Sequence, residues 1–124
     1  MDAHTKALKG FYNQSQKIFQ NSGQAIYLYL NDTHKLCNMK FAKLLGYSSA
    51  KEWSEMDKPF TSAFVDEKSQ SMLVHAYQDA VEKSIGSAIP VTWKTKNSKR
   101  VKTDVILVPV AFNGSMMAMH FITK

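Results

Sequence analysis

The length, composition and charge of the chain exclude several classes of protein. Its 124 residues are 44% hydrophobic and 21% charged, with 5 Gly and 3 Pro, so we expect one folded domain and exclude disordered and collagen-like chains. The net charge of +6 could suit an acidic partner, but Arg100 is the one arginine among 16 basic residues. Because forked contacts to phosphate or guanine favour arginine, nucleic acid is not the expected partner.

The cysteine and histidine content argues against disulfides and metal sites. Cys37 is the single cysteine, and the four histidines at positions 4, 34, 75 and 120 lack zinc-ligand spacing. No apolar run approaches about 18 residues, and the chain does not begin with a secretion signal. We therefore expect a cytoplasmic protein without a metal and without a membrane partner.

The first predicted element is an amphipathic helix over residues 3–20, ended near Gly23. Its apolar stripe consists of Leu8, Phe11, Tyr12, Ile18 and Phe19. This stripe needs a partner, either the sheet of its own domain or the same helix of a second copy. We expect a dimerisation helix at residues 1–22, with these five residues at the interface, followed by one domain at residues 23–124.

A hairpin and several helices are predicted next. Alternating apolar residues predict a strand over 24–30 that is covered on both faces, and residues 35–39 predict a returning strand. One short helix ends at Gly46, and the capping box Ser49-x-x-Glu52 begins another. Residues 57–65 read as an ordered connection. Asp66 caps a long helix over about 67–85 that Gly86 ends, and His75 lies on its solvent face.

Three strands are predicted at the end of the chain, over residues 89–96, 99–112 and 115–123. Asn113-Gly114 is a strong two-residue hairpin signal that pairs Phe112 with Ser115. In this register both faces of the hairpin are apolar, so the internal helices must cover one face and the first helix or a second subunit the other. Pro109 predicts a bulge or an unpaired register point in the middle strand.

Residues 38–48 carry the pattern Asn-x-x-Phe-x-x-Leu-x-Gly-Tyr-Ser, which resembles a segment of PAS sensor domains. Phe64-Val65-Asp66 before the long helix and the closing hairpin around Val108-Pro109-Val110 extend the resemblance over about residues 20–124. It implies an α+β fold with a five-stranded antiparallel sheet in the order 2-1-5-4-3. It also implies a pocket between sheet and helices, and dimers formed through an N-terminal helix on the outer face of the sheet.

The resemblance also allows cofactor types to be compared. A light-oxygen-voltage flavin sensor would carry Asn-Cys-Arg-Phe after the Gly-Tyr pair, whereas Cys37 precedes Asn38 on a strand, as a small buried thiol would. A haem-binding PAS domain would place a histidine on the inner face of the long helix, and His75 points away from it. His120 is expected to be a hydrogen-bonded or surface residue. The cofactor therefore stays unknown, with haem and covalent flavin disfavoured.

Enzyme signatures are missing from the sequence. It has no P-loop, no nucleophile elbow, no dinucleotide fingerprint and no paired carboxylates on a helix face, and Asp104 is expected at a solvated sheet end. A non-enzymatic sensory or interaction domain that binds a small ligand or a signalling partner is favoured. Two alternatives stay open: a cone-shaped α+β isomerase with a buried Asp or His, and a purely structural dimerisation module.

Two groups of residues are candidates for binding. Six large side chains could line a common cavity or simply form core: Phe41, Trp53, Phe64, Tyr77, Trp93 and Met119. Five basic residues crowd one turn between strands, as a solvated hairpin tip or as a patch for an acidic partner: Lys94, Lys96, Lys99, Arg100 and Lys102.

Overall fold

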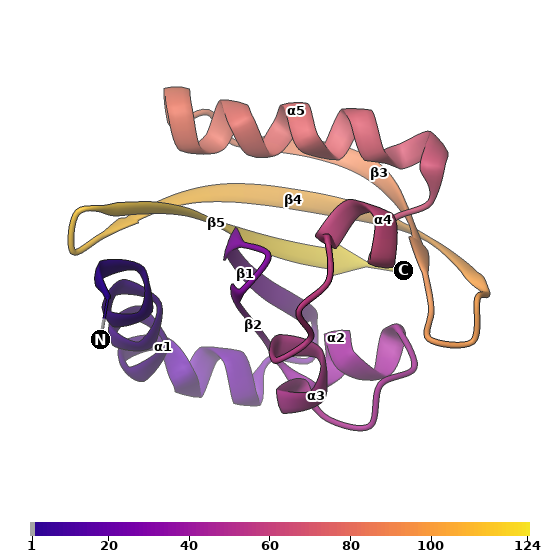
Figure 1. Ribbon diagram of the computed structural model, residues 1–124, viewed down its shortest axis with the longest axis horizontal. Helices are drawn as coiled ribbons and strands as arrows, with labels where there is room; N and C mark the ends of the chain where they lie inside the picture. The colour runs from indigo at the N-terminus through magenta and orange to yellow at the C-terminus, as the bar shows by residue number, and fades with distance from the viewer. Residues whose placement is uncertain (1) are drawn as a thin grey trace.

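The computed structural model describes residues 2–124, which form five helices and five strands (Figure 1). In chain order these are α1 (Ala3–Asn21), β1 (Ala25–Asn31), β2 (His34–Cys37), α2 (Met39–Leu44), α3 (Ala50–Ser54), α4 (Phe60–Phe64), α5 (Glu67–Lys83), β3 (Ser87–Lys94), β4 (Arg100–Phe112) and β5 (Ser115–Thr123). None of the helices within the described residues combines the length and the apolar character needed to cross a membrane.

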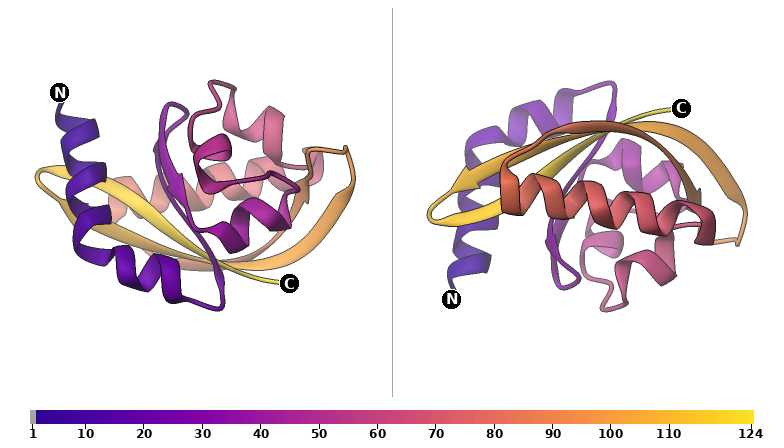
Figure 2. Two further views of the ribbon diagram at one scale, coloured as in Figure 1. Left: turned by 90° about the horizontal axis from the view of Figure 1, so that it is seen from below. Right: turned by 90° about the horizontal axis from the view of Figure 1, so that it is seen from above.

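The strands form one antiparallel sheet in the order β2-β1-β5-β4-β3, so the predicted α+β fold is confirmed. One buried cluster lies between the sheet and α2 to α5, and a second lies between the sheet and α1. Figure 2 shows α1 and the short helices α3 and α4 on opposite sides of the β1–β2 hairpin. The sheet is therefore the middle layer of the molecule.

The side chains of β1 divide between the two layers as their alternation predicts. Ile26, Leu28 and Leu30 belong to the cluster under α1. Tyr27 and Tyr29 belong to the cluster under α2 to α5. A residue of β1 therefore faces either the N-terminal helix or the other helices according to its parity.

Asn38 joins three elements at the start of α2. Its Oδ1 accepts hydrogen bonds from the backbone N–H groups of Phe41 and Ile26, both at 3.1 Å. Its Nδ2 donates to the carbonyls of Phe19 (3.1 Å) and Gln24 (2.8 Å). Because this buried amide uses both donors and both acceptor sites, it caps α2 and fixes the end of α1 against β1.

The β4–β5 hairpin has the predicted register but not the predicted bulge. Asn113 and Gly114 have positive φ, 49° and 78°, and Phe112 pairs with Ser115. Pairing with β5 continues without interruption through Pro109 and Ala118, so no bulge forms, whereas Pro109 has no partner in β3, as the alternative of an unpaired position expects. The reason is that β3 ends opposite Leu107, so Pro109 lies beyond the last β3 pair, where β4 has a free edge and needs no N–H donor.

Several helix boundaries differ from those predicted. Helix α1 ends at Asn21, its C-cap Ser22 is extended, and Gly23 is not left-handed. Helix α5 ends at Lys83, and its C-cap Ser84 is left-handed with a φ of 56°, so Gly86 is not its terminator. Residues expected to form a connection before Asp66 include the short helix α4. The caps at Ser49 and Asp66 are confirmed, since both side chains accept a backbone N–H of their helix.

Helix α1 covers only part of the outer sheet face. Its cluster includes Met117 and Met119 of β5 and the end of β4. Farther along β4, Ile106 and Val108 point to the same side of the sheet but stay 51% and 39% exposed. Coverage of both apolar faces is therefore confirmed within the single chain for β1 and β5, whereas α1 leaves the middle of β4 uncovered, so there the predicted cover would have to be a second subunit.

Candidate functional site

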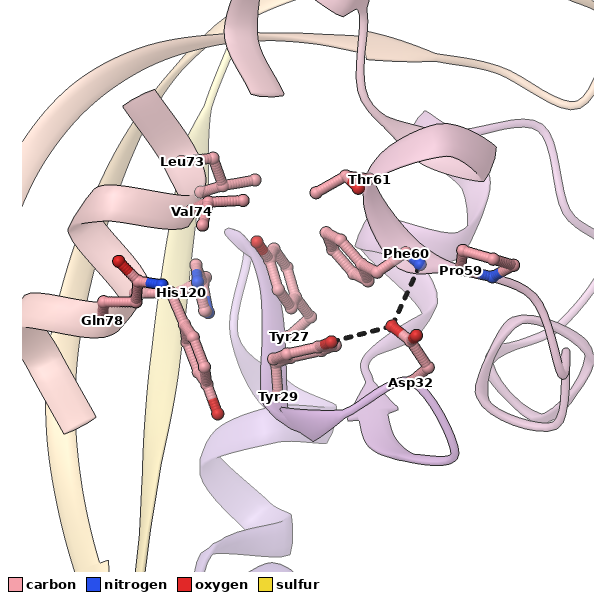
Figure 3. A pocket seen from close by; sticks show the side chains of 11 residues that line it. Tyr27, Tyr29, Asp32, Pro59, Phe60, Thr61, Leu73, Val74, Gln78 and His120 are labelled. Atoms are coloured by element: carbon pink, nitrogen blue, oxygen red, sulfur yellow. Dashed lines mark hydrogen bonds between the residues drawn. The ribbon is translucent and has the colours of Figure 1, made fainter. Parts of the chain in front are cut away.

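A cleft with a volume of about 290 Å³ lies between β1, α4 and α5 (Figure 3). Five segments of the chain contribute to it: β1, the β1–β2 turn, the start of α4, one face of α5, and β5. Its lining residues are Tyr27, Tyr29, Asp32, Pro59, Phe60, Thr61, Leu73, Val74, Tyr77, Gln78 and His120. The cleft thus has mainly aromatic and aliphatic walls with a few polar groups, as small-molecule sites do.

Two tyrosine hydroxyl groups at the cleft already donate hydrogen bonds within the chain. Tyr29 donates to Asp32 Oδ1 at 2.8 Å, and Tyr77 donates to the carbonyl oxygen of Leu30. The two rings meet edge to face with centroids 5.1 Å apart. Burial raises the pKa of Tyr77 to about 12, and burial together with the hydrogen bond to Asp32 raises the pKa of Tyr29. Both phenols are therefore neutral at physiological pH.

Asp32 fixes the β1–β2 turn against α4. Its Oδ1 also accepts the backbone N–H of Phe60 at 3.0 Å. The ammonium group of buried Lys35 donates to the main-chain carbonyls of Asp32 (2.8 Å) and Met56 (2.7 Å) and lies 5.2 Å from the Trp53 ring centroid. Burial lowers the pKa of Lys35, and the nearby carboxylates of Asp32 and Asp57 oppose that shift.

The hydroxyl of Tyr27 is a fully buried polar group beside the cleft. Tyr27 is 0% exposed, and its hydroxyl oxygen has no hydrogen-bond partner among residues 2–124. Figure 3 shows the hydroxyl directed toward Leu73 and Val74 of α5. A buried hydroxyl without a partner costs about 1–3 kcal/mol, so the folded chain keeps an unused donor and acceptor here.

His120 stacks on Tyr27 and is uncharged. The two ring centroids are 3.9 Å apart and the planes differ by 11°. A carbonyl oxygen only accepts, so the 3.1 Å contact to Ala118 places the proton on Nδ1 of His120. Burial lowers the pKa of His120 to about 3, and the ring therefore stays neutral at pH 7.

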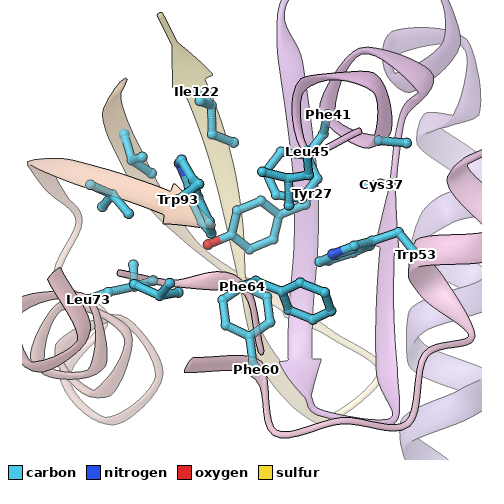
Figure 4. Packing of buried hydrophobic residues seen from close by; sticks show 14 of the residues in the cluster. Tyr27, Cys37, Phe41, Leu45, Trp53, Phe60, Phe64, Leu73, Trp93 and Ile122 are labelled. Atoms are coloured by element: carbon cyan, nitrogen blue, oxygen red, sulfur yellow. The ribbon is translucent and has the colours of Figure 1, made fainter. Parts of the chain in front are cut away.

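The predicted pocket residues separate into three places. Tyr77 lines the cleft. Four others, Phe41, Trp53, Phe64 and Trp93, are fully buried in the same core cluster as Tyr27 (Figure 4). They form core and not a cavity wall. Met119 lies on the opposite face of the sheet, under α1, because its neighbour His120 points inward and residues alternate along β5.

Several cleft residues were not singled out from the sequence. The alternation over 24–30 does put Tyr27 and Tyr29 on one face, but it does not say that this face borders a cleft. Asp32 reads as a turn residue, and its bond to the Phe60 N–H spans 28 positions. Such long-range contacts have no local signal.

The residues of the predicted dimerisation stripe also separate. Leu8 and Phe19 are buried against the chain's own sheet. Phe11 packs on Phe112 and Tyr12 on Phe19, with centroids 5.8 Å and 5.5 Å apart. Ile18 is 61% exposed. Of the two partners open for this stripe, the chain's own sheet holds most of it.

The basic residues near the β3–β4 turn are largely paired. Lys94 lies 3.2 Å from Glu67, Lys96 2.7 Å from Glu52, and Arg100 2.7 Å from Asp66. These pairs are exposed and each contributes little to stability. They reduce the free positive charge that an acidic partner would meet.

The other candidate chemical groups are isolated. Cys37 is buried on β2, where burial raises the pKa of its thiol to about 12. His75 is exposed on α5, and Asp104 is exposed on β4, as expected. Within residues 2–124, no three His, Cys, Asp or Glu side chains gather as metal ligands.

Comparison with known proteins gives matches to solved structures. No protein-family model matches the chain, and no curated protein matches it. A PAS domain from Colwellia psychrerythraea has a TM-score of 0.70 at 16% identity, covering 92% of this chain and 96% of that one. A PAS domain from a two-component sensor histidine kinase has a TM-score of 0.67 at 8% identity, covering 93% and 96%.

A third solved structure is that of VqmA, a LuxR-type receptor of Vibrio cholerae, bound to DPO. Its TM-score is 0.68 at 9% identity, and the match covers 90% of this chain and 56% of VqmA. Taken with the strand order and the helical layer, these likenesses show a PAS-like α+β fold. The chain has the PAS fold.

Proposed function

We propose that the chain is a PAS-type sensory domain that binds a small molecule in the cleft between β1, α4 and α5. The observation that carries this proposal is the Tyr27 hydroxyl, which is buried beside the cleft without a partner among residues 2–124. A bound molecule that hydrogen-bonds this group removes its desolvation cost. The fold agrees with such a role, since similar domains occur in a sensor histidine kinase and in ligand-bound VqmA.

Binding suits the cleft better than catalysis does. A general acid or base works best when its pKa is near the operating pH. The His120 ring has a pKa of about 3, and the pKa values of Tyr29 and Tyr77 are raised, so these three groups hold fixed protonation states at neutral pH. The isomerase alternative would need one of the cleft groups to titrate near neutrality.

Replacing Tyr27 by phenylalanine tests the ligand role of its hydroxyl. We expect Tyr27→Phe to raise the free energy of unfolding by about 1 kcal/mol, because it removes an unsatisfied buried group, and to weaken binding of 2-phenylethanol. Urea denaturation measures the first effect, and NMR titration of the cleft resonances measures the second.

The matched control is Tyr77→Phe, which removes a satisfied hydroxyl from the same cleft. It loses the bond to the Leu30 carbonyl, so it is expected to lower the free energy of unfolding by about 1 kcal/mol. A destabilised Tyr27→Phe protein that binds 2-phenylethanol as tightly as the wild type would contradict the proposal.

We also propose that two copies associate through the outer side of α1 and of the sheet. The residues that support this surface are Ile18 on α1, and Ile106 and Val108 on β4; all three are apolar and exposed. Residues 1–22 would then act as a dimerisation element, with the half-exposed parts of Phe11 and Tyr12 beside Ile18. A ligand would signal to a partner protein by its differential affinity for two packings of α1 on the sheet.

Solution mass tests the dimer. We expect wild-type protein to be a dimer by light scattering and Ile18→Glu to shift it to monomer, because a charge would be buried at the interface. Ile18 contributes little to the core of the monomer, so the variant should fold normally. The control is Met72→Glu on α5, a 48% exposed position on the other side of the molecule, which should stay dimeric. An Ile18→Glu dimer would remove α1 from the interface.

A further inference from the structure

We infer that the cleft selects a small aromatic amine, a cation, over a neutral or anionic molecule of the same shape. This inference rests on the proposed function, because it assumes that the cleft binds a ligand. The chain has 16 basic residues and a net charge of +6, yet none of the residues that line the cleft is Lys or Arg. Asp32 is the one carboxylate among them.

The carboxylate of Asp32 has room for another donor. Both of the hydrogen bonds it accepts, from the Tyr29 hydroxyl and the Phe60 N–H, go to Oδ1. Within residues 2–124, Oδ2 receives no hydrogen bond. The ammonium group of Lys35 donates two hydrogen bonds, to the main-chain carbonyls of Asp32 and Met56, and within residues 2–124 it forms no ion pair with the Asp32 carboxylate.

The walls beside Asp32 favour an ammonium group for a second reason. Tyr29 donates to Asp32, so its ring lies next to the carboxylate, and Phe60 and Tyr77 pack edge to face on that ring at 4.8 Å and 5.1 Å. Aromatic faces attract cations within about 6 Å. An ammonium bound to Asp32 would therefore meet a carboxylate and an aromatic ring together.

An anionic ligand would meet no lysine or arginine among the residues that line the cleft. It would be desolvated next to Asp32 with neutral His120, neutral tyrosines and the amide of Gln78 as its polar neighbours. Removing an ion from water without a counter-charge is unfavourable, and placing it beside a like charge adds repulsion. The cleft therefore disfavours carboxylates and phosphates, because the Asp32 carboxylate lines it and no lysine or arginine does.

Three probes of one shape test the charge preference: phenethylamine, 2-phenylethanol and 3-phenylpropanoate. Dissociation constants are measured by NMR titration at neutral pH and low ionic strength. We expect the amine to bind about tenfold more tightly than the alcohol, because a hydrogen bond to a charged group is stronger than a neutral one. The carboxylate is expected to bind most weakly of the three.

The variant Asp32→Asn tests whether the charge of Asp32 causes the preference for the amine. Asparagine keeps the acceptor oxygen for Tyr29 and Phe60 and removes only the charge, so the amine should fall to the affinity of the alcohol while the alcohol itself is unchanged. Asp104→Asn, an exposed carboxylate on β4 outside the cleft, is the control and should leave all three constants unaltered.

The outcomes separate the two proposals. A carboxylate that binds as tightly as the amine, or an amine preference that survives in Asp32→Asn, overturns the charge inference and leaves ligand binding in place. If none of the three probes moves the resonances of the cleft residues, the proposed function fails and the inference fails with it. The ranking of the probes on wild-type protein stands even if the variant folds poorly.

Discussion

Acidification from pH 6.5 to about pH 4.5 is expected to lower the free energy of unfolding by about 2 kcal/mol through His120 alone. The pKa of this residue is about 3 in the folded chain, against 6.5 for the free side chain. Between these values the unfolded chain binds a proton that the folded chain does not, so stability decreases as the pH falls. The physical cause is burial of the ring between Tyr27 and the sheet, where its charged form is poorly solvated.

His120→Phe isolates this contribution. Phenylalanine keeps an aromatic ring against Tyr27 and cannot be protonated, so urea unfolding curves of the variant should be nearly independent of pH over the same interval. The pKa values of exposed Glu52 and Asp66 are lowered by Lys96 and Arg100, and their contribution is lost at more acidic pH in both proteins. If the free energy of unfolding depends on pH in the same way for wild type and variant above pH 4.5, the pKa of His120 does not differ between the folded and unfolded chains.

Trp93→Ala is expected to destabilise the chain by about 3–5 kcal/mol, the range for removing a large aromatic side chain from a core. Trp93 is fully buried on β3, where its ring meets Tyr27 and Phe41 edge to face at 5.6 Å and 5.4 Å. Its Nε1 donates to the Thr103 hydroxyl at 2.9 Å. The variant loses these packing contacts and leaves a void among rings that cannot readily close around it.

Two further variants calibrate this result by urea denaturation. Trp93→Phe keeps part of the ring volume, and Thr103 still donates to the Val91 carbonyl, so its loss should lie between wild type and Trp93→Ala. Met72→Ala removes an exposed side chain from α5 and should change the free energy of unfolding by less than about 0.5 kcal/mol. A Trp93→Ala loss as small as that of Met72→Ala would mean that the aromatic cluster is not tightly packed.

Short sequence patterns predicted those parts of the fold that depend on residues close together in the chain. Asn113 and Gly114 tolerate positive φ, so they fix the β4–β5 register, and alternation along β1 separates Tyr27 from Ile26. The order of the strands required the resemblance to PAS domains. The end of α5 was missed because Ser84 adopts a left-handed conformation that glycine usually supplies, held by its N–H bond to Ala80.

The candidate site was predicted less completely, for a different reason. Residue size alone does not separate a side chain that fills a core from one that borders a cavity, so Trp53 and Trp93 were grouped with Tyr77. The cleft is defined by approaches between distant segments, such as Tyr77 on α5 donating to Leu30 on β1, 47 positions away. Asp32 gained its place at the cleft in the same way, through Phe60.

The isolation of Cys37 gives the chain a built-in reporter. Its thiol lies on the edge strand β2 and faces the carbonyl of Ala50 at the start of α3, at 4.0 Å. Cys37 is only 5% exposed, so a thiol-specific reagent is expected to react mainly in those molecules where α3 has moved away from β2. The rate of alkylation is therefore expected to measure how often α3 separates from β2, and the measurement needs no introduced label.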